Sequence, residues 1–214
     1  MKQALRLIMV ASFWFILSGI SDTVQSPPST DSEPLGRPVS VKISGPLIHE
    51  PSGFEFPESY DSFSRSLILR YDTAGLDMSV HYNDKWAGCK LATTFYVYPT
   101  PRTSGTGAPP DMTPSVQEGW LEEQIQNSKY AIKHYHPSLQ SLTTGTTTTP
   151  TADGNLNGRL LTFREAGTFS EQRVFVYKTI WFLKYRFTYP ESCRTEAASR
   201  IQSLLSQLPW ATGS

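Results

Sequence analysis

The chain lacks most of the features that reveal a function in a sequence. Its 214 residues carry 19 basic and 19 acidic side chains, and Lys and Arg do not cluster as a nucleic-acid-binding surface requires. It has no GxGxxG, GxxxxGK[ST] or GxSxG segment and no CxxC motif. His134 and His136 are two residues apart on a predicted helix, so their rings diverge instead of sharing a metal. We therefore expect no nucleic-acid partner, cofactor or metal, and no motif assigns catalytic residues.

Cysteine is scarce as well, with only Cys89 and Cys193 present. In an oxidising compartment these two residues permit one intramolecular disulfide, which would close a loop of about 100 residues. The chain-entropy model gives such a bond roughly 4 to 5 kcal/mol of stabilisation. The alternative is two buried thiols that pack as small apolar side chains.

A single long apolar run stands at the N-terminus. Lys2 and Arg6 precede an uncharged apolar stretch over residues 7–20, which is shorter than the roughly 20 residues that a membrane helix needs. This pattern predicts a signal peptide at residues 1–21, cleaved before Asp22, with a retained signal anchor as the alternative. We expect an exported protein, periplasmic or extracellular, with no integral membrane span after cleavage.

Composition divides the rest of the chain. Residues 22–38 are polar and rich in proline, which predicts a flexible tether before a single domain at residues 39–210. Two low-complexity segments, at residues 99–112 and 143–154, are expected to be surface loops.

Periodicity predicts the elements of the domain. Leu76, Met78, Val80 and Tyr82 alternate with Asp77, Ser79, His81 and Asn83, as in a half-buried strand with one polar face. Thr113 and Pro114 are typical of a helix start, and this helix should run to about Tyr135. A second amphipathic helix is expected at residues 194–208. The sequence therefore predicts an α+β fold: an antiparallel sheet of about six strands with two main helices packed on it.

One group of basic residues is a candidate site. Lys184 and Arg186 alternate onto the same face of the predicted last strand, and a two-residue hairpin turn would place Arg173 opposite Lys184. Like charges at such positions repel, so the cluster needs carboxylates, water or a bound anion nearby. We predict an anion-binding or partner-binding patch here, and the alternative is an internally neutralised or solvent-facing polar row.

Parts of the chain resemble exported bacterial proteins of unknown function over about residues 60 to 210. The segments that carry the resemblance are YDTAGLDMSVHY from Tyr71, ATTFYVY from Ala92 and FLKYRFTYP from Phe182. The order of elements is similar, more loosely, to the α/β sandwich of PsbP-type and DcrB-type proteins. Neither resemblance implies catalytic residues.

The expected function follows from these observations. We expect a non-catalytic binding or accessory protein of the bacterial cell envelope, whose partner is an envelope protein or another envelope component. One alternative is a secreted hydrolase whose site is assembled only in three dimensions. The other is a signal-anchored accessory subunit of a membrane complex.

Overall fold

The computed structural model describes residues 34–101, 113–151, 154–178 and 180–208. The predicted signal peptide, most of the predicted tether and most of the first predicted loop lie outside these residues. Within the described part, no helix is both long and apolar enough to cross a membrane.

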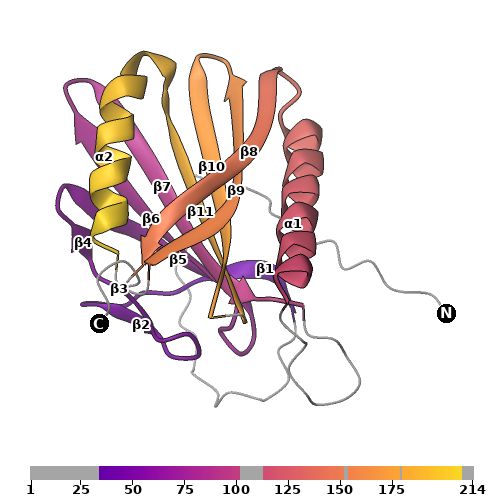
Figure 1. The fold of residues 1–214 in the computed structure, drawn as a ribbon. Coiled ribbons are helices and arrows are strands. Elements are labelled where there is room, and N and C mark those ends of the chain that lie inside the picture. The colour runs from indigo at the N-terminus through magenta and orange to yellow at the C-terminus, as the bar shows by residue number, and fades with distance from the viewer. Residues whose placement is uncertain (1–33, 102–112, 152–153, 179, 209–214) are drawn as a thin grey trace.

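A nine-stranded antiparallel sheet dominates the fold (Figure 1). Its strands follow the order β1-β5-β6-β7-β11-β10-β9-β8, and β4 pairs with β5 beside this path. The elements before the first helix are β1 (Pro34–Ser40), β2 (Leu47–His49), β3 (Phe54–Phe56), β4 (Ser59–Tyr60), β5 (Phe63–Asp72), β6 (Met78–Trp86) and β7 (Cys89–Pro99). The later elements are α1 (Pro114–Tyr135), β8 (Leu139–Thr151), β9 (Gly154–Glu165), β10 (Thr168–Tyr177), β11 (Trp181–Pro190), η1 (Glu191–Cys193) and α2 (Arg194–Ser206).

The predicted α+β class, with about six strands, is wrong, because the protein is mostly sheet and its helices are minor parts. The expected loop at residues 143–154 caused the largest error, since it contributes to β8 and begins β9. Its threonines are β-branched and favour extended backbone, even though they resemble a low-complexity linker. β1 begins at Pro34, so residues 34–38 of the predicted tether belong to an edge strand.

Both predicted helices are present. Thr113 caps α1, and its hydroxyl accepts a hydrogen bond from the Val116 backbone N–H at 3.4 Å, while Pro114 occupies the first helical position. Apolar residues spaced along one side of α1 face the sheet: Leu121, Ile125 and Ile132. In α2 the buried residues are Ala197, Ile201, Leu204 and Leu205.

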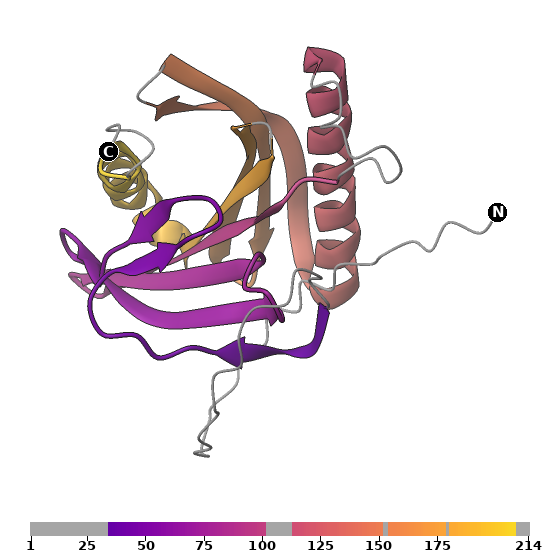
Figure 2. The same ribbon diagram turned by 90° about the horizontal axis from the view of Figure 1, so that it is seen from below.

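The sheet separates two apolar clusters. Figure 2 shows it curving around α2, with α1 on the outer side. The cluster on the α2 side also includes the β2–β3 hairpin, through Leu47, Phe54 and Phe56, and the aromatic side chains Tyr82, Phe95 and Tyr185. The cluster on the α1 side is smaller, and its buried sheet residues come from β7, β9, β10 and β11: Tyr96, Tyr98, Leu161, Phe163, Val174, Val176 and Phe182.

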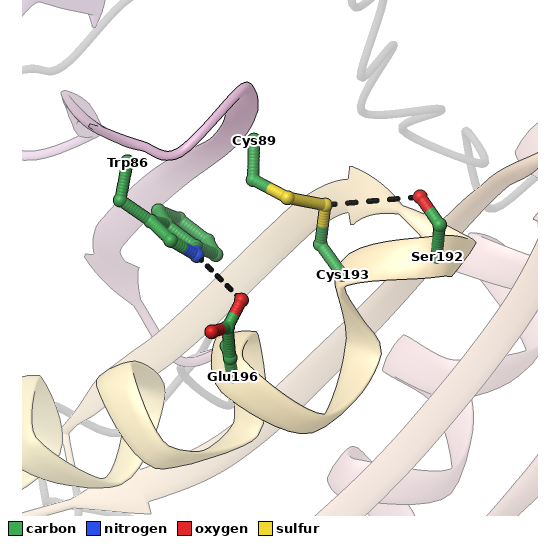
Figure 3. The surroundings of a disulfide bond; sticks show 5 residues. All are labelled: Trp86, Cys89, Ser192, Cys193 and Glu196. Atoms are coloured by element: carbon green, nitrogen blue, oxygen red, sulfur yellow. Dashed lines mark hydrogen bonds between the residues drawn. A yellow bond between two sulfur atoms is a disulfide. The ribbon is translucent and has the colours of Figure 1, made fainter.

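The two cysteines form a disulfide, the first of the two alternatives that the sequence left open (Figure 3). Cys89 begins β7 and Cys193 immediately precedes α2. The bond therefore joins the start of α2 to the sheet beside the β6–β7 turn. Beside it, the Trp86 indole N–H donates to a Glu196 carboxylate oxygen at 2.9 Å. Both contacts hold α2 against the sheet.

Candidate functional site

A row of polar side chains crosses the α1 side of the sheet where β6, β7 and β11 meet. We call it the polar strip, and its members are Tyr71, Asp77, Ser79, His81, Thr94, Lys184 and Arg186. The strand register brings them together, because His81 pairs with Thr94 and Thr94 with Arg186. One step along, Ser79 pairs with Tyr96 and Tyr96 with Lys184. Directly paired residues point to the same side of a sheet, so these side chains share one face.

The helix α1 covers only part of this face. It packs on β8, β9 and β10, and it reaches the end of the polar strip through Gln124, whose side-chain oxygen accepts from the Tyr98 hydroxyl at 2.9 Å. Several members of the strip keep partial exposure: Tyr71, Asp77, His81, Thr94 and Arg186. Beneath them, Lys184 is only 4 % exposed and Ser79 is fully buried.

Hydrogen bonds connect four members of the strip in a chain. The Tyr71 and Ser79 hydroxyls lie 3.0 Å apart, and Ser79 Oγ lies 3.1 Å from His81 Nε2. On the other side of the ring, Thr94 Oγ1 lies 3.2 Å from His81 Nδ1. Burial, together with the positive charge of Arg186, lowers the pKa of His81 to about 4. The imidazole is therefore neutral at pH 7, with one nitrogen donating and the other accepting.

Lys184, which is buried, and the partly exposed Asp77 are two interacting ionisable groups of the strip. The Lys184 ammonium lies 4.4 Å from the centroid of the Tyr96 ring and 5.6 Å from that of Tyr98, which supplies cation–π stabilisation. Burial lowers the pKa of Lys184 to about 8 and raises that of Asp77 to about 7, and each group partly offsets the shift of the other. At neutral pH the Asp77 carboxyl is therefore only partly charged, while Lys184 is mainly cationic.

Arg173 does not join this group, so its predicted position opposite Lys184 is wrong. It pairs with Tyr185, whereas Val174 occupies the position opposite Lys184. The connection between β10 and β11 contains three residues instead of two, because Tyr177 pairs with Trp181. A shift of one residue moves a side chain to the other face of a sheet. There Arg173 forms an ion pair with Glu171 at 2.9 Å.

A serine nucleophile at Ser79 is poorly supported, although its hydroxyl contacts an imidazole. Acyl transfer requires a hydroxyl that a substrate can reach, and Ser79 has no exposed surface. The chain Tyr71–Ser79–His81 therefore resembles a buried network that fixes the side chains above it.

A second serine–histidine contact, which the sequence did not predict, is structural. His49 is buried, and its Nδ1 lies 2.5 Å from Ser52 Oγ while Nε2 donates to the Gly75 carbonyl at 2.9 Å. The Gly75 carbonyl can only accept, so Nδ1 accepts from Ser52. These bonds fasten the β2–β3 hairpin to the β5–β6 turn.

The histidines near the end of α1 do not form a metal site. His136 Nδ1 contacts a carboxylate oxygen of Glu165, whose other oxygen accepts from Ser138 at 2.6 Å. His134 instead stacks on the ring of Tyr130. Across the described residues, no group of three or more His, Cys, Asp or Glu side chains is placed to hold a metal ion.

A cleft of about 350 Å³ opens between α2 and the β4–β5 turn. Its main cation is Arg200, which donates to a carboxylate oxygen of the buried Asp84 at 2.5 Å and to Ser62 at 3.3 Å. The guanidinium also lies over the Trp86 ring, 4.3 Å from its centroid. These contacts already neutralise the cation and fix its position, so the cleft is a weaker candidate site than the polar strip.

Comparisons with protein families, with characterised proteins and with solved structures find no match to this chain.

Proposed function

We propose that the chain is a non-catalytic domain of an exported protein, which binds an anionic group of an envelope protein or another envelope component through its polar strip. The observation that carries this proposal is the placement of Lys184 and Arg186 on one face of the sheet, beside the partly exposed His81 and Thr94. The N-terminal sequence and the disulfide support export, since disulfides persist in oxidising compartments.

The charges of the strip favour an anion. Lys184 interacts with Asp77, and burial together with the nearby Asp72 raises the pKa of Asp77 to about 7, which leaves it partly neutral at physiological pH. In the ion pairs Arg173–Glu171 and Arg159–Glu118, the guanidinium group contacts a carboxylate directly. No such direct ion pair is described between Lys184 and Asp77. An anionic ligand could bind beside Lys184 without displacing a direct salt bridge between Lys184 and Asp77.

The hydrolase alternative depends on Ser79 and His81, which are the described residues best placed for it. The 3.1 Å contact between their side chains is suitable for proton transfer, but the serine would have to become exposed before it could attack a substrate. Binding requires no such change, because His81 and Arg186 already have partial exposure.

A site-specific photo-crosslinker tests the binding site in cells that express the protein natively. Leu67 pairs with His81, lies on the face of the strip and is 38 % exposed, so replacing it with p-benzoylphenylalanine places the probe beside the strip. Tyr130 is 64 % exposed on α1 and provides a matched control position. We expect a discrete adduct from position 67 that disappears with Arg186→Gln, and none from position 130. Equal adducts from both positions, or adducts unaffected by Arg186→Gln, would contradict the proposal.

Mass spectrometry of the N-terminus tests export separately. A mature chain that begins at Asp22 in the envelope or medium would support the signal peptide. Recovery of Met1 on the envelope-associated protein would favour the signal-anchored accessory subunit, and recovery from the cytoplasm would contradict export.

A further inference from the structure

The edge strand β8 is unlike the rest of the sheet. Among the described residues it pairs only with β9, although it is 13 residues long. It contains no charged residue, and more than half of its residues are threonine. In its central part, Thr143, Thr144, Gly145 and Thr146 are all exposed, so neither face is covered there.

The opposite edge of the sheet, β1, has features that discourage further pairing. Pro34 and Pro38 lack the N–H group that a new strand would need, and Arg37 adds a charge. Its pairing with β5 is also irregular between Pro34 and Val39. β8 has none of these protections before Pro150, near its end. The two edges therefore differ in the property that controls strand addition.

We propose that β8 pairs antiparallel with β8 of a second copy of this chain, so that the two sheets become continuous across a two-fold axis. An edge strand presents unpaired N–H and C=O groups, and β-branched side chains pair well across strands. Two identical antiparallel strands form an isologous contact, which closes at two copies. This inference goes beyond the proposed binding function and does not depend on it.

Self-pairing fits the chemistry of β8 better than pairing with another segment of the same chain. Because the strand is uncharged, its pairing with itself places no like charges opposite each other, and on both sides of the central Gly145 threonine meets threonine. Residues 22–33 contain Pro27 and Pro28 and lead into β1, at the other edge of the sheet. Without residues 1–21, which hold Lys2, Arg6 and no acidic residue, the chain has 17 basic and 19 acidic residues, and a net charge of −2 gives two copies no strong mutual repulsion.

Sedimentation velocity of the purified mature chain, from micromolar to millimolar concentration, tests the proposal. We expect a monomer–dimer equilibrium that the double variant Thr144→Lys/Thr146→Lys weakens roughly tenfold or more, because like charges then face each other. The control Thr195→Lys/Gln202→Lys adds the same charge at exposed positions of α2 and should dimerise as the unmodified chain does. A monomer at all concentrations, or equal dimerisation of the two double variants, would overturn the proposal.

Cysteine crosslinking keeps the test decisive if the lysine variant fails to fold. An antiparallel pairing centred on β8 brings Gly145 of the two copies close together, and a Cβ added there meets no atom within 4 Å. Gly145→Cys should give an intermolecular disulfide on mild oxidation. Gly36→Cys, at the protected β1 edge and equally unobstructed, should not. Crosslinking of both variants to the same extent, or of neither, would refute pairing through β8.

Discussion

The face of the sheet that packs against α2 differs from the face toward α1 in whether its buried charged side chains form direct ion pairs. On the α2 side, apolar and aromatic side chains fill the interior, and the buried Asp84 is paired directly with Arg200. On the α1 side, an apolar half under the helix adjoins the polar strip, where the buried Lys184 and the partly exposed Asp77 have no described direct ion pair. Unpaired buried charge reduces stability, and the α1 side of the sheet is where we propose the binding site.

The largest effect should come from placing a charge in the apolar face. Leu204 is 1 % exposed on α2, and Leu204→Asp would bury a carboxylate that has no partner. We expect a loss of about 4 kcal/mol in the free energy of unfolding, measured by chemical denaturation. Gln202→Asp, exposed on the same helix, should change it by less than about 0.5 kcal/mol. Equal stability of the two variants would show that α2 does not dock through Leu204.

Removing the disulfide should have the next largest effect on the α2 side. Cys89→Ser/Cys193→Ser releases the start of α2 from the sheet, and we expect a loss of roughly 2 to 4 kcal/mol. Each single variant should lose nearly as much as the double variant, because either change breaks the same bond. An unchanged denaturation midpoint under oxidising conditions would show that the bond adds no stability.

The polar strip should respond to pH through His81. The folded protein holds the pKa of His81 at about 4, below its ordinary value of 6.5, so protonation favours the unfolded chain. The stability of the neutral form is present above pH 6.5 and is lost as the pH falls toward 4, by on the order of 2 to 3 kcal/mol. The contribution of His81 is measured as the difference in the free energy of unfolding between the unmodified protein and His81→Gln at each pH.

The unmodified protein must be compared with His81→Gln because Asp77 changes the stability in the opposite direction over an overlapping range of pH. Its pKa is raised to about 7 from 3.8, so its contribution to stability is present below 3.8 and is lost as the pH rises through 7. Since His81→Gln retains Asp77, this contribution largely cancels in the difference. A pH-independent difference between the two chains would contradict the burial of a neutral imidazole.

The smallest change in stability, with the opposite sign, is expected from Lys184→Met. Methionine fills a similar volume without a buried charge, so stability at pH 7 should stay the same or rise by about 1 kcal/mol. The adduct from a crosslinker at position 67 should nevertheless disappear. Lys85→Met, at an exposed position, should leave both measurements unchanged. A clear loss of stability would assign Lys184 a structural role instead.

The helices were predictable from local sequence, because their signals are short-range. Thr113 and Pro114 mark the start of α1, and the spacing of Ala197, Ile201 and Leu204 marks the buried side of α2. β8 was missed because its threonines form a strand only in contact with β9, and composition alone does not distinguish a polar strand from a polar loop.

The candidate site was only partly predictable. Alternation along single strands correctly placed Lys184 with Arg186, and Ser79 with His81. It could not bring the two pairs together, because that depends on the pairing of β7 with β11 across a long stretch of chain. The predicted position of Arg173 was wrong for a local reason. The connection between β10 and β11 is one residue longer than predicted, which moves the Arg173 side chain to the other face of the sheet.

The junction between β7 and β11 also has a consequence for folding kinetics. Within β5 to β7 and within β8 to β11, each strand pairs with strands next to it in the sequence. The pairing of β7 with β11 instead joins residues far apart in the sequence, such as Ala92 and Thr188. Loop closure over such a separation is slow compared with hairpin formation. The disulfide joins Cys89 and Cys193 next to these same residues. Refolding of the oxidised chain should therefore be limited by strand formation within each half, and refolding of the reduced chain by the encounter between the halves.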